Sequence, residues 1–304
     1  MPPRRAGGRK TDHGHEHSDG YEHDHGHQHG QPHDQGHDSE HPHGYEDRPD
    51  TPPAAGLCLT VRAGSGLSGD MMLAGLALMA GTSQDDLDAH VAELGLGALA
   101  GSVCLERRSV NHVAGWGCRV RLPHEHAHRT MRDITAIIEK SVMAPRAAAM
   151  AVQAFSLLAR AEGAVHGLAP QDVTFHEVGA LDSILDICLA CSLFARLEPA
   201  RFVCSPLPLA DGGVRCAHGW LPTPAPAVLE LLRDVPVCGF AGRGETVTPT
   251  AIALLKAMGA EFGPWPSMRI ERRALVYGDR VFADAPNGAV WALGPALDPA
   301  LRRR

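Results

Sequence analysis

The 304-residue sequence contains no apolar run near the roughly 18 to 20 residues that a membrane-spanning helix needs, so it predicts no membrane partner. Aromatic residues are scarce as well, at 5% of the chain. The basic opening MPPRRAGGRK is followed by no apolar stretch, which argues against a secretory signal. These absences favour a soluble globular protein.

The cysteines lack a paired spacing pattern. Eight are scattered along the chain, at positions 58, 104, 118, 188, 191, 204, 216 and 238. Only Cys188 and Cys191 lie close together, and they fall in an apolar helical run, so buried free thiols are favoured over a metal or redox site. Because disulfides are rare in the cytoplasm, this usage predicts a cytoplasmic location.

An excess of positive charge is also missing. The formal net charge is −7, and residues 1–50, with five basic and eleven acidic side chains, account for −6 of it. The rest of the chain is therefore close to neutral, whereas nucleic-acid-binding domains generally carry a basic surface. The composition predicts no nucleic-acid partner.

Histidine is abundant near the N-terminus. Residues 1–55 show no hydrophobic period and end in a proline-rich linker, so they cannot bury a core and are predicted to be a disordered tail. Glycine-spaced histidines in a flexible chain can bind metal without a fold. The predicted ligands in this tail are His13, His15, His17, His23, His25, His27 and His29.

Residues 56–295 alternate short apolar strands with helical patterns, and residues 296–304 form a basic tail. LCLTV at 57–61 is typical of a buried strand, and a glycine-rich loop and an apolar helix beginning near Asp70 follow it. Further helical patterns cover residues 84–94, 131–141, 145–166, 223–234 and 248–259, with another beginning near 180. The predicted fold class is α/β, a mixed sheet with alternating strands and helices preceded by the disordered His-rich tail.

The loop SGLSGDM at 65–71 is the first candidate site. Its glycines permit tight turns, its serines offer hydroxyl groups, and backbone N–H groups at the start of a helix can bind a phosphate. The loop lacks the lysine of a P-loop, and an ordinary strand-to-helix turn remains the alternative. The candidate nucleotide-binding residues are Ser65, Gly66, Ser68, Gly69 and Asp70.

A second candidate is HEHAHR at 124–129. His124, His126 and His128 alternate, so in an extended segment all three side chains point to one face and could chelate Ni²⁺, Zn²⁺ or Cu²⁺. Arg129 follows at once and could contact a phosphate. A solvated polar loop is the alternative.

The segment FHEVGALDSILD carries the densest group of titratable residues. His176 and Glu177 precede a predicted helix in which Asp182 and Asp186 are four residues apart and share a face. Together they suit a divalent cation or proton transfer. The alternative is that the acids only cap the helix and offset its dipole.

Two later segments have simpler interpretations. Thr248 and Pro249 are typical of a helix N-cap and first helical position, which leaves Glu245 unassigned. His218, alone beside a turn, is interpreted as structural.

Taken in order, these segments resemble the LarC family of nickel-insertion proteins. The resemblance rests on SGLSGDM, HEHAHR, AEGAVHG, FHEVGALDSILDI, SPLPLADGGVRCAHGWLPTPAPAVLELL and GETVTPTAIALL, and it runs from about Leu57 to Leu293. The chain departs from the family pattern at Arg62, Ala63 and Gly64, and at Ala251, where a glycine is usual. It also ends without the further C-terminal domain of full-length members, so the resemblance covers the first domain.

The resemblance implies a nickel chelatase. Its expected activity is the insertion of Ni²⁺ into pyridinium-3,5-bisthiocarboxylic acid mononucleotide, the precursor of the nickel-pincer cofactor of lactate racemase-type enzymes. It implies that CTP is consumed, with Mn²⁺ or Mg²⁺, through a separately encoded second domain, and that a pincer-dependent apo-enzyme receives the product. On this interpretation the tail is a nickel reservoir. A non-catalytic nickel-storage protein or metallochaperone is the alternative.

Overall fold

The structure is a computed structural model that describes residues 56–122, 129–175, 179–216, 218–283 and 285–297. The chain divides into two compact units, residues 1–49 and 50–304, and all the described residues belong to the second. The predicted tail, with its seven histidine ligands, and the segments holding His124, His126 and His128 and holding His176 and Glu177 lie outside the described residues.

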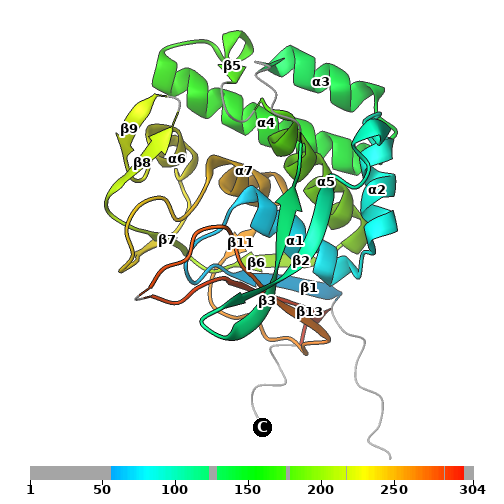
Figure 1. Ribbon diagram of the computed structural model, residues 1–304, viewed down its shortest axis with the longest axis vertical. Coiled ribbons are helices and arrows are strands. Elements are labelled where there is room, and N and C mark those ends of the chain that lie inside the picture. The colour runs from blue at the N-terminus through cyan, green and yellow to red at the C-terminus, as the bar shows by residue number, and fades with distance from the viewer. Residues whose placement is uncertain (1–55, 123–128, 176–178, 217, 284, 298–304) are drawn as a thin grey trace, which may run out of the picture. The chain divides into compact units, whose positions relative to one another are not determined.

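Helices and strands alternate along most of the described chain (Figure 1). The α-helices are α1 (Gly69–Ala80), α2 (Gln84–Glu93), α3 (Met131–Lys140), α4 (Pro145–His166), α5 (Leu181–Leu197), α6 (Pro226–Leu231) and α7 (Pro249–Ala257). The strands of the main sheet are β1 (Leu57–Arg62), β2 (Val103–Val110), β3 (Val113–Val120), β6 (Arg201–Cys204), β11 (Glu261–Phe262), β12 (Arg272–Val276) and β13 (Ala289–Pro295).

Three small two-stranded sheets lie outside the main one. They are formed by β4 (Arg129–Thr130) with β5 (Thr174–Phe175), by β7 (Leu207–Leu209) with β10 (Val237–Gly239), and by β8 (Gly213–Cys216) with β9 (Gly219–Pro222). Short 3₁₀ turns occupy Gly97–Leu99 and Pro170–Asp172. None of the helices in the described part of the chain combines the length and apolar character needed to cross a membrane.

The main sheet is mixed, with the order β11-β6-β1-β13-β12-β3-β2. Strand β1 runs parallel to β6, where Leu59 is opposite Phe202, and antiparallel to β13, where Leu59 is opposite Leu293. Strands β12 and β13 are antiparallel, and β2 and β3 form an antiparallel hairpin. The predicted α/β class with a mixed sheet is therefore confirmed.

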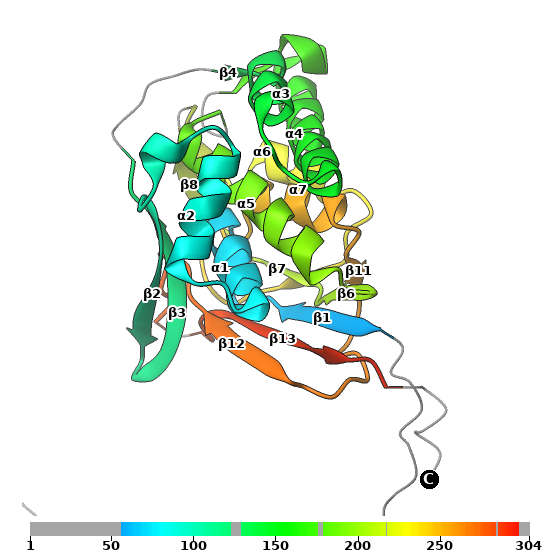
Figure 2. The same ribbon diagram turned by 90° about the vertical axis from the view of Figure 1, so that its right-hand side faces the viewer.

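The helices lie on one face of the sheet, with α1 next to the strands and α4 farther away (Figure 2). Helix α1 packs against β3, β12, β13 and α5, while α4 packs against α5, α6 and α7. A helix enclosed in this way must be apolar nearly all round, as the sequence of α1 is. Trp291 of β13 lies so close to α1 that a Cβ at Gly75 would be 2.0 Å from its ring, so only glycine fits there.

Most of the predicted elements are found, and boundaries differ by a few residues. The alternation in GCRVRL at 117–122 predicts a strand, and the structure places that strand at Val113–Val120. The sequence interpretation assigned no strand to Arg272–Val276 or Ala289–Pro295, although both belong to the main sheet. Cys188 and Cys191 are free and fully buried in α5, which confirms the interpretation of the CLAC pair as core residues.

Candidate functional site

The glycine-rich loop after β1 is tied to the segment that precedes α7. Leu67 N–H donates to the carbonyl oxygen of Thr246 at 2.9 Å, and Thr248 N–H donates to the carbonyl oxygen of Leu67 at 3.1 Å. Gly66 has a φ of 126°, and a Cβ there would be 1.9 Å from the Thr246 oxygen. Close approach of the two backbones therefore requires glycine at position 66.

A cavity of about 250 Å³, here called the loop cavity, opens where these two segments meet the connection between β12 and β13. Three segments that are distant in sequence thus line the loop cavity. The residues that line it are Ser65, Gly66, Ser68, Asp70, Met71, Glu245, Thr246, Thr248, Gly278, Asp279, Arg280, Phe282 and Gly288.

Two carboxyl groups, Asp70 and Asp186, lie beside this loop and are called the carboxylate pair. Asp70 is in the first turn of α1, and a Cβ at Gly69 would be 2.8 Å from Oδ2 of Asp186 on α5. Oδ1 of Asp186 is shielded from solvent and has no hydrogen-bond partner among the described residues. Burial, with the charges of Asp70 and Asp182 adding to it, raises the pKa of Asp186 well above its usual range.

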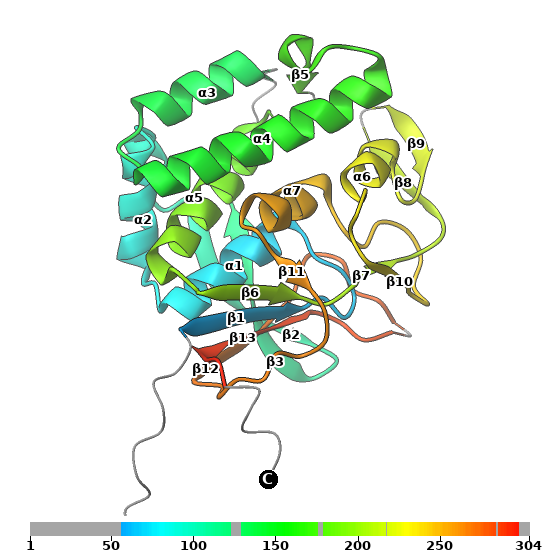
Figure 3. The same cartoon turned by 180° about the vertical axis from the view of Figure 1, so that it is seen from behind.

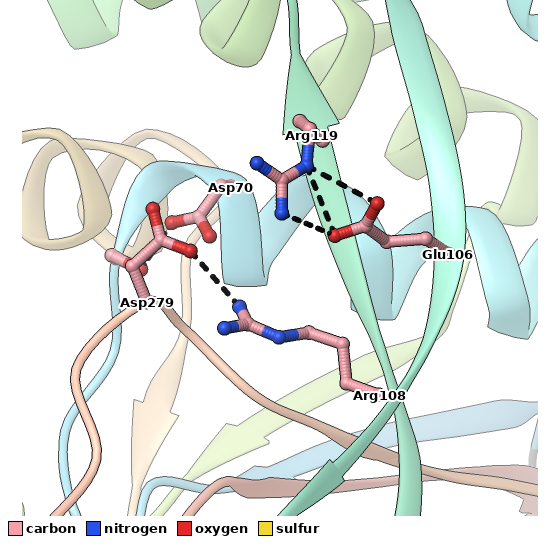
Figure 4. Close-up of polar contacts among 6 residues, drawn as sticks. Asp70, Glu106, Arg108, Arg119 and Asp279 are labelled. Carbon is pink, nitrogen blue, oxygen red and sulfur yellow. Dashed lines mark hydrogen bonds and ion pairs between the residues drawn. The ribbon is translucent and has the colours of Figure 1, made fainter.

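The surroundings of Asp70 shift its pKa in both directions, up and down. Burial is the main cause that raises its pKa, and the nearby Asp279 carboxylate adds to this, while the hydroxyl group of Ser68, which donates to Asp70, opposes it. Figure 4 shows the Asp70 and Asp279 side chains close together, with Arg108 of β2 reaching Asp279. Nη1 of Arg108 is 3.0 Å from Oδ1 of Asp279, which is largely exposed.

One cation, Arg280, lines the loop cavity. Its Nη1 donates to the carbonyl oxygen of Glu245 at 3.2 Å, and its guanidinium carbon lies 5.4 Å from the centre of the Phe282 ring. A guanidinium group held in this way offers further N–H donors to a phosphate or carboxylate. The loop cavity therefore combines a cation, hydroxyl groups and carboxyl groups.

A second cavity of about 330 Å³, called the histidine cavity, shares Glu245 and Thr248 with the loop cavity, so the two adjoin. It lies among α4, the start of α5, the start of α7 and the β8–β9 hairpin. Figure 3 shows these four elements from behind. Its polar lining residues are Glu162, His166, Asp182, Ser183, Arg215, Cys216, His218, Glu245, Thr248 and Thr250.

Comparison with known proteins gives the family. The family model described as nickel insertion protein matches residues 59–296. The chain belongs to the nickel insertion protein family. The match includes most of β1, the glycine-rich loop, α5 and both segments that border the loop cavity, so both cavities lie within the family domain.

Curated relatives agree with this assignment. A protein of Syntrophotalea carbinolica, whose name also describes nickel insertion, is 41% identical over 237 residues, which is 77% of this chain and 59% of the relative. Two others carry the name pyridinium-3,5-bisthiocarboxylic acid mononucleotide nickel insertion protein. The one from Desulfitobacterium hafniense is 39% identical over 68% of this chain and 51% of its own length, and the one from Nocardioides sp. is 38% identical over 75% and 57%.

The chain spans between 51% and 59% of the length of these three relatives. No solved structure matches it. The nickel insertion family is therefore established by sequence, and the geometry of its cavities in this chain comes from the present structure.

The structure brings most of the predicted loop residues together. Ser65, Gly66, Ser68 and Asp70 line the loop cavity, whereas Gly69 packs against Asp186 and Thr250. Gly66 and Gly69 thus have a packing role, whereas the sequence analysis assigned them to phosphate binding. Whether the loop also binds a phosphate stays a prediction.

The remaining described candidates are more dispersed. Asp182 is exposed and lines the histidine cavity, while Asp186 is partly buried and lies next to Gly69. Nη1 of Arg129 on β4 donates to the carbonyl oxygen of Gly179 at 2.8 Å, and Arg129 lines neither cavity. The nucleotide contact predicted for Arg129 therefore has no support from its position.

Sequence reasoning missed several residues of this site. Asp279 and Arg280 fall in a segment that it left unassigned, and Glu245 had no role. Glu162 and His166 are four residues apart in AEGAVHG, a spacing that places both side chains on one helix face and could have drawn attention to them. His218 was interpreted as structural, but it lines the histidine cavity together with them.

Proposed function

We propose that this chain inserts Ni²⁺ into pyridinium-3,5-bisthiocarboxylic acid mononucleotide. The observation that carries the proposal is the pair of adjoining cavities within the matched family domain, one with a cation and hydroxyl groups, the other with imidazole groups. A phosphorylated, metal-binding substrate needs both kinds of group. The printed names of two relatives describe this same insertion.

In this proposal the mononucleotide occupies the loop cavity. Arg280 is the cation that holds its phosphate, with the hydroxyl groups of Ser65 and Ser68 and the N-terminal end of α1 nearby. Phe282, which lines the same cavity, offers an aromatic face to the positively charged pyridinium ring. Ordering the substrate there leaves its metal-binding atoms free to face the adjoining histidine cavity.

The carboxylate pair serves as the proton acceptor. A metal ion displaces protons from the atoms that it binds, so an insertion site needs a group that takes them up. Asp186 is suited to this role because burial raises its pKa, and a raised pKa makes the carboxylate a stronger base. His176 and Glu177, predicted from sequence to act with it, and the ligands His124, His126 and His128 remain part of the proposal.

Several finer expectations belong to the proposal. CTP, with Mn²⁺ or Mg²⁺, is used together with a second domain encoded separately, a pincer-dependent apo-enzyme receives the product, and the protein works in the cytoplasm. The histidines of the N-terminal tail store nickel for the insertion site. If the tail is such a store, deletion of residues 1–50 lowers the number of bound Ni²⁺ ions and leaves the melting temperature of the remaining protein unchanged.

The deciding experiment is insertion of Ni²⁺ into the purified nucleotide, followed by mass spectrometry of the product. The full chain is incubated with the nucleotide, Ni²⁺ and CTP, with and without the C-terminal part of one of the longer relatives. We expect nickel-bound product, and an increase when the second domain is added. Nickel binding by the chain without any product under either condition would favour the storage or metallochaperone function instead.

A further inference from the structure

Three potential metal ligands meet at the C-terminal end of α4. Glu162 and His166 lie one turn apart on the same helix face, with Nε2 of His166 3.3 Å from Oε2 of Glu162. His218, in the turn between β8 and β9, lies opposite, and the centres of the two imidazole rings are 4.9 Å apart. One ligand atom from each of the three side chains lies within 4.8 Å of the other two.

We propose that Glu162, His166 and His218 form a binding site for a divalent transition metal ion, and that the ion it carries is the Ni²⁺ destined for the nucleotide. The second clause rests on the proposed function. Two imidazoles and a carboxylate suit Ni²⁺ and its neighbours in the first transition row. Ligand atoms about 2.1 Å from one ion are at most about 4.2 Å apart, so side-chain shifts below about 1 Å complete the site.

The surroundings of this group, called the His–Glu cluster, suit a transit site rather than a structural one. Three protein ligands leave coordination positions open, as in catalytic zinc sites, whereas structural sites are closed by a fourth. The side chains of Glu162 and His166 keep exposures of 20% and 29%, and all three residues line the histidine cavity. An ion held there is accessible from solvent and to a ligand that enters from the adjoining loop cavity.

Nickel binding can be followed at this site despite the many histidines elsewhere in the chain. High-spin Ni²⁺ is paramagnetic and broadens nearby proton signals. Trp220 is two residues from His218, within about 7 Å along an extended chain, and the protein has only three other tryptophans as internal references. NMR spectra of the indole N–H groups are recorded for the full chain during titration with Ni²⁺.

The wild-type chain is compared with His166→Ala, His218→Ala and Glu162→Gln. His112→Asn, at an exposed position in the turn between β2 and β3, is the matched histidine control.

We expect preferential broadening of the Trp220 signal in the wild type and the control. In each cluster variant the nickel concentration needed for it should rise at least about tenfold. The signal of buried Trp291 reports whether each variant is folded, and Glu162→Gln, the mildest change, keeps the test usable if a histidine variant unfolds.

The outcomes separate the site from the function. Unchanged broadening in all three folded cluster variants would overturn the metal site. Loss of binding with full insertion activity would overturn the transit role and leave the proposed function standing. Loss of both supports the whole proposal, whereas wild-type binding at Trp220 with no insertion under any condition refutes the proposed function and retains the metal site.

Discussion

The carboxylate pair and the His–Glu cluster lie near adjoining cavities, but they differ in their exposure to solvent and in their polar contacts. Asp186 has a shielded oxygen without a partner among the described residues, and its pKa is raised by burial. Glu162 and His166 are partly exposed and contact each other. An acid buried without a cation destabilises a fold, whereas ligands near the surface cost little.

On the proposed function, this difference separates two tasks, the uptake of protons and the capture of the metal ion. A group that takes up protons at neutral pH benefits from burial, because burial raises the basicity of a carboxylate. A group that captures a hydrated cation must remain accessible and must later release it. We therefore expect substitutions in the two regions to affect different measurable properties.

The largest effect is expected for Asp186→Asn. An amide cannot accept a proton, so insertion activity should fall by at least about 100-fold, the usual contribution of a general base. Nickel binding at the His–Glu cluster should be unchanged. Activity is measured by the mass-spectrometric assay, with Asp85→Asn, at an exposed position on α2, as the control. An equal loss of nickel binding at the His–Glu cluster, measured by broadening of the Trp220 signal, would show that the two regions are not separate.

The next effect concerns packing around the carboxylate pair. A Cβ at Gly69 would lie 2.8 Å from Oδ2 of Asp186 and 2.9 Å from Cγ2 of Thr250. Gly69→Ala should therefore lower the free energy of unfolding by about 1 to 3 kcal/mol, the usual cost of overpacking. Gly263→Ala, at a position where a Cβ meets nothing within 4 Å, is the control. Urea denaturation without substrate gives both values, and equal midpoints would contradict the close contact.

The pH dependence of stability provides a third test. The pKa of Asp186 is raised in the folded state. Its protonated form therefore contributes its full stabilisation of the fold at a pH below the unfolded pKa, near 4. This stabilisation is lost as the pH rises through the folded pKa. Each unit of pKa difference corresponds to about 1.4 kcal/mol. Asp186→Asn removes this loss, so its stability relative to the wild type should increase from pH 4.5 to pH 8. Parallel stability curves for the two proteins would show that Asp186 titrates normally.

The smallest effect is expected at the exposed edge of the loop cavity. Asp279→Asn removes a like charge that raises the pKa of Asp70, so that pKa should fall. The same change removes the ion pair between Asp279 and Arg108. Because the Asp279 side chain is 91% exposed, the free energy of unfolding should change by less than about 1 kcal/mol. Carbon-detected NMR of the carboxyl groups follows the titration of Asp70. An unchanged pKa would mean that solvent screens the two carboxylates from each other.

The sequence predicted local structure better than it predicted contacts between distant segments. The spacing of Asp182 and Asp186 correctly indicated two acids on one helix face, but it could not show that only the second lies against Gly69 at the start of α1. Gly66 carried the right conformational signal, yet the segments that require glycine at positions 66 and 69 are a hundred residues or more away in the chain.

The same limit explains the missed strands. AVWALGP in β13 shows no alternation of polar and apolar residues, because consecutive residues of this strand, which point to opposite faces, are buried. Such a run resembles a buried helix segment as much as a strand. The His–Glu cluster was missed for a related reason. Its third member comes from a hairpin that no periodic pattern connects with α4.

The position of β13 also determines when the domain can assemble. Residues 289–295 pair with residues 57–62 on one side and 272–276 on the other, and they supply the tryptophan that packs against Gly75. Until a ribosome has released this segment, β1 has an unpaired edge and α1 lacks its largest neighbour. The sheet therefore closes only after nearly the whole domain has been synthesised, and its many contacts between distant residues predict slow folding.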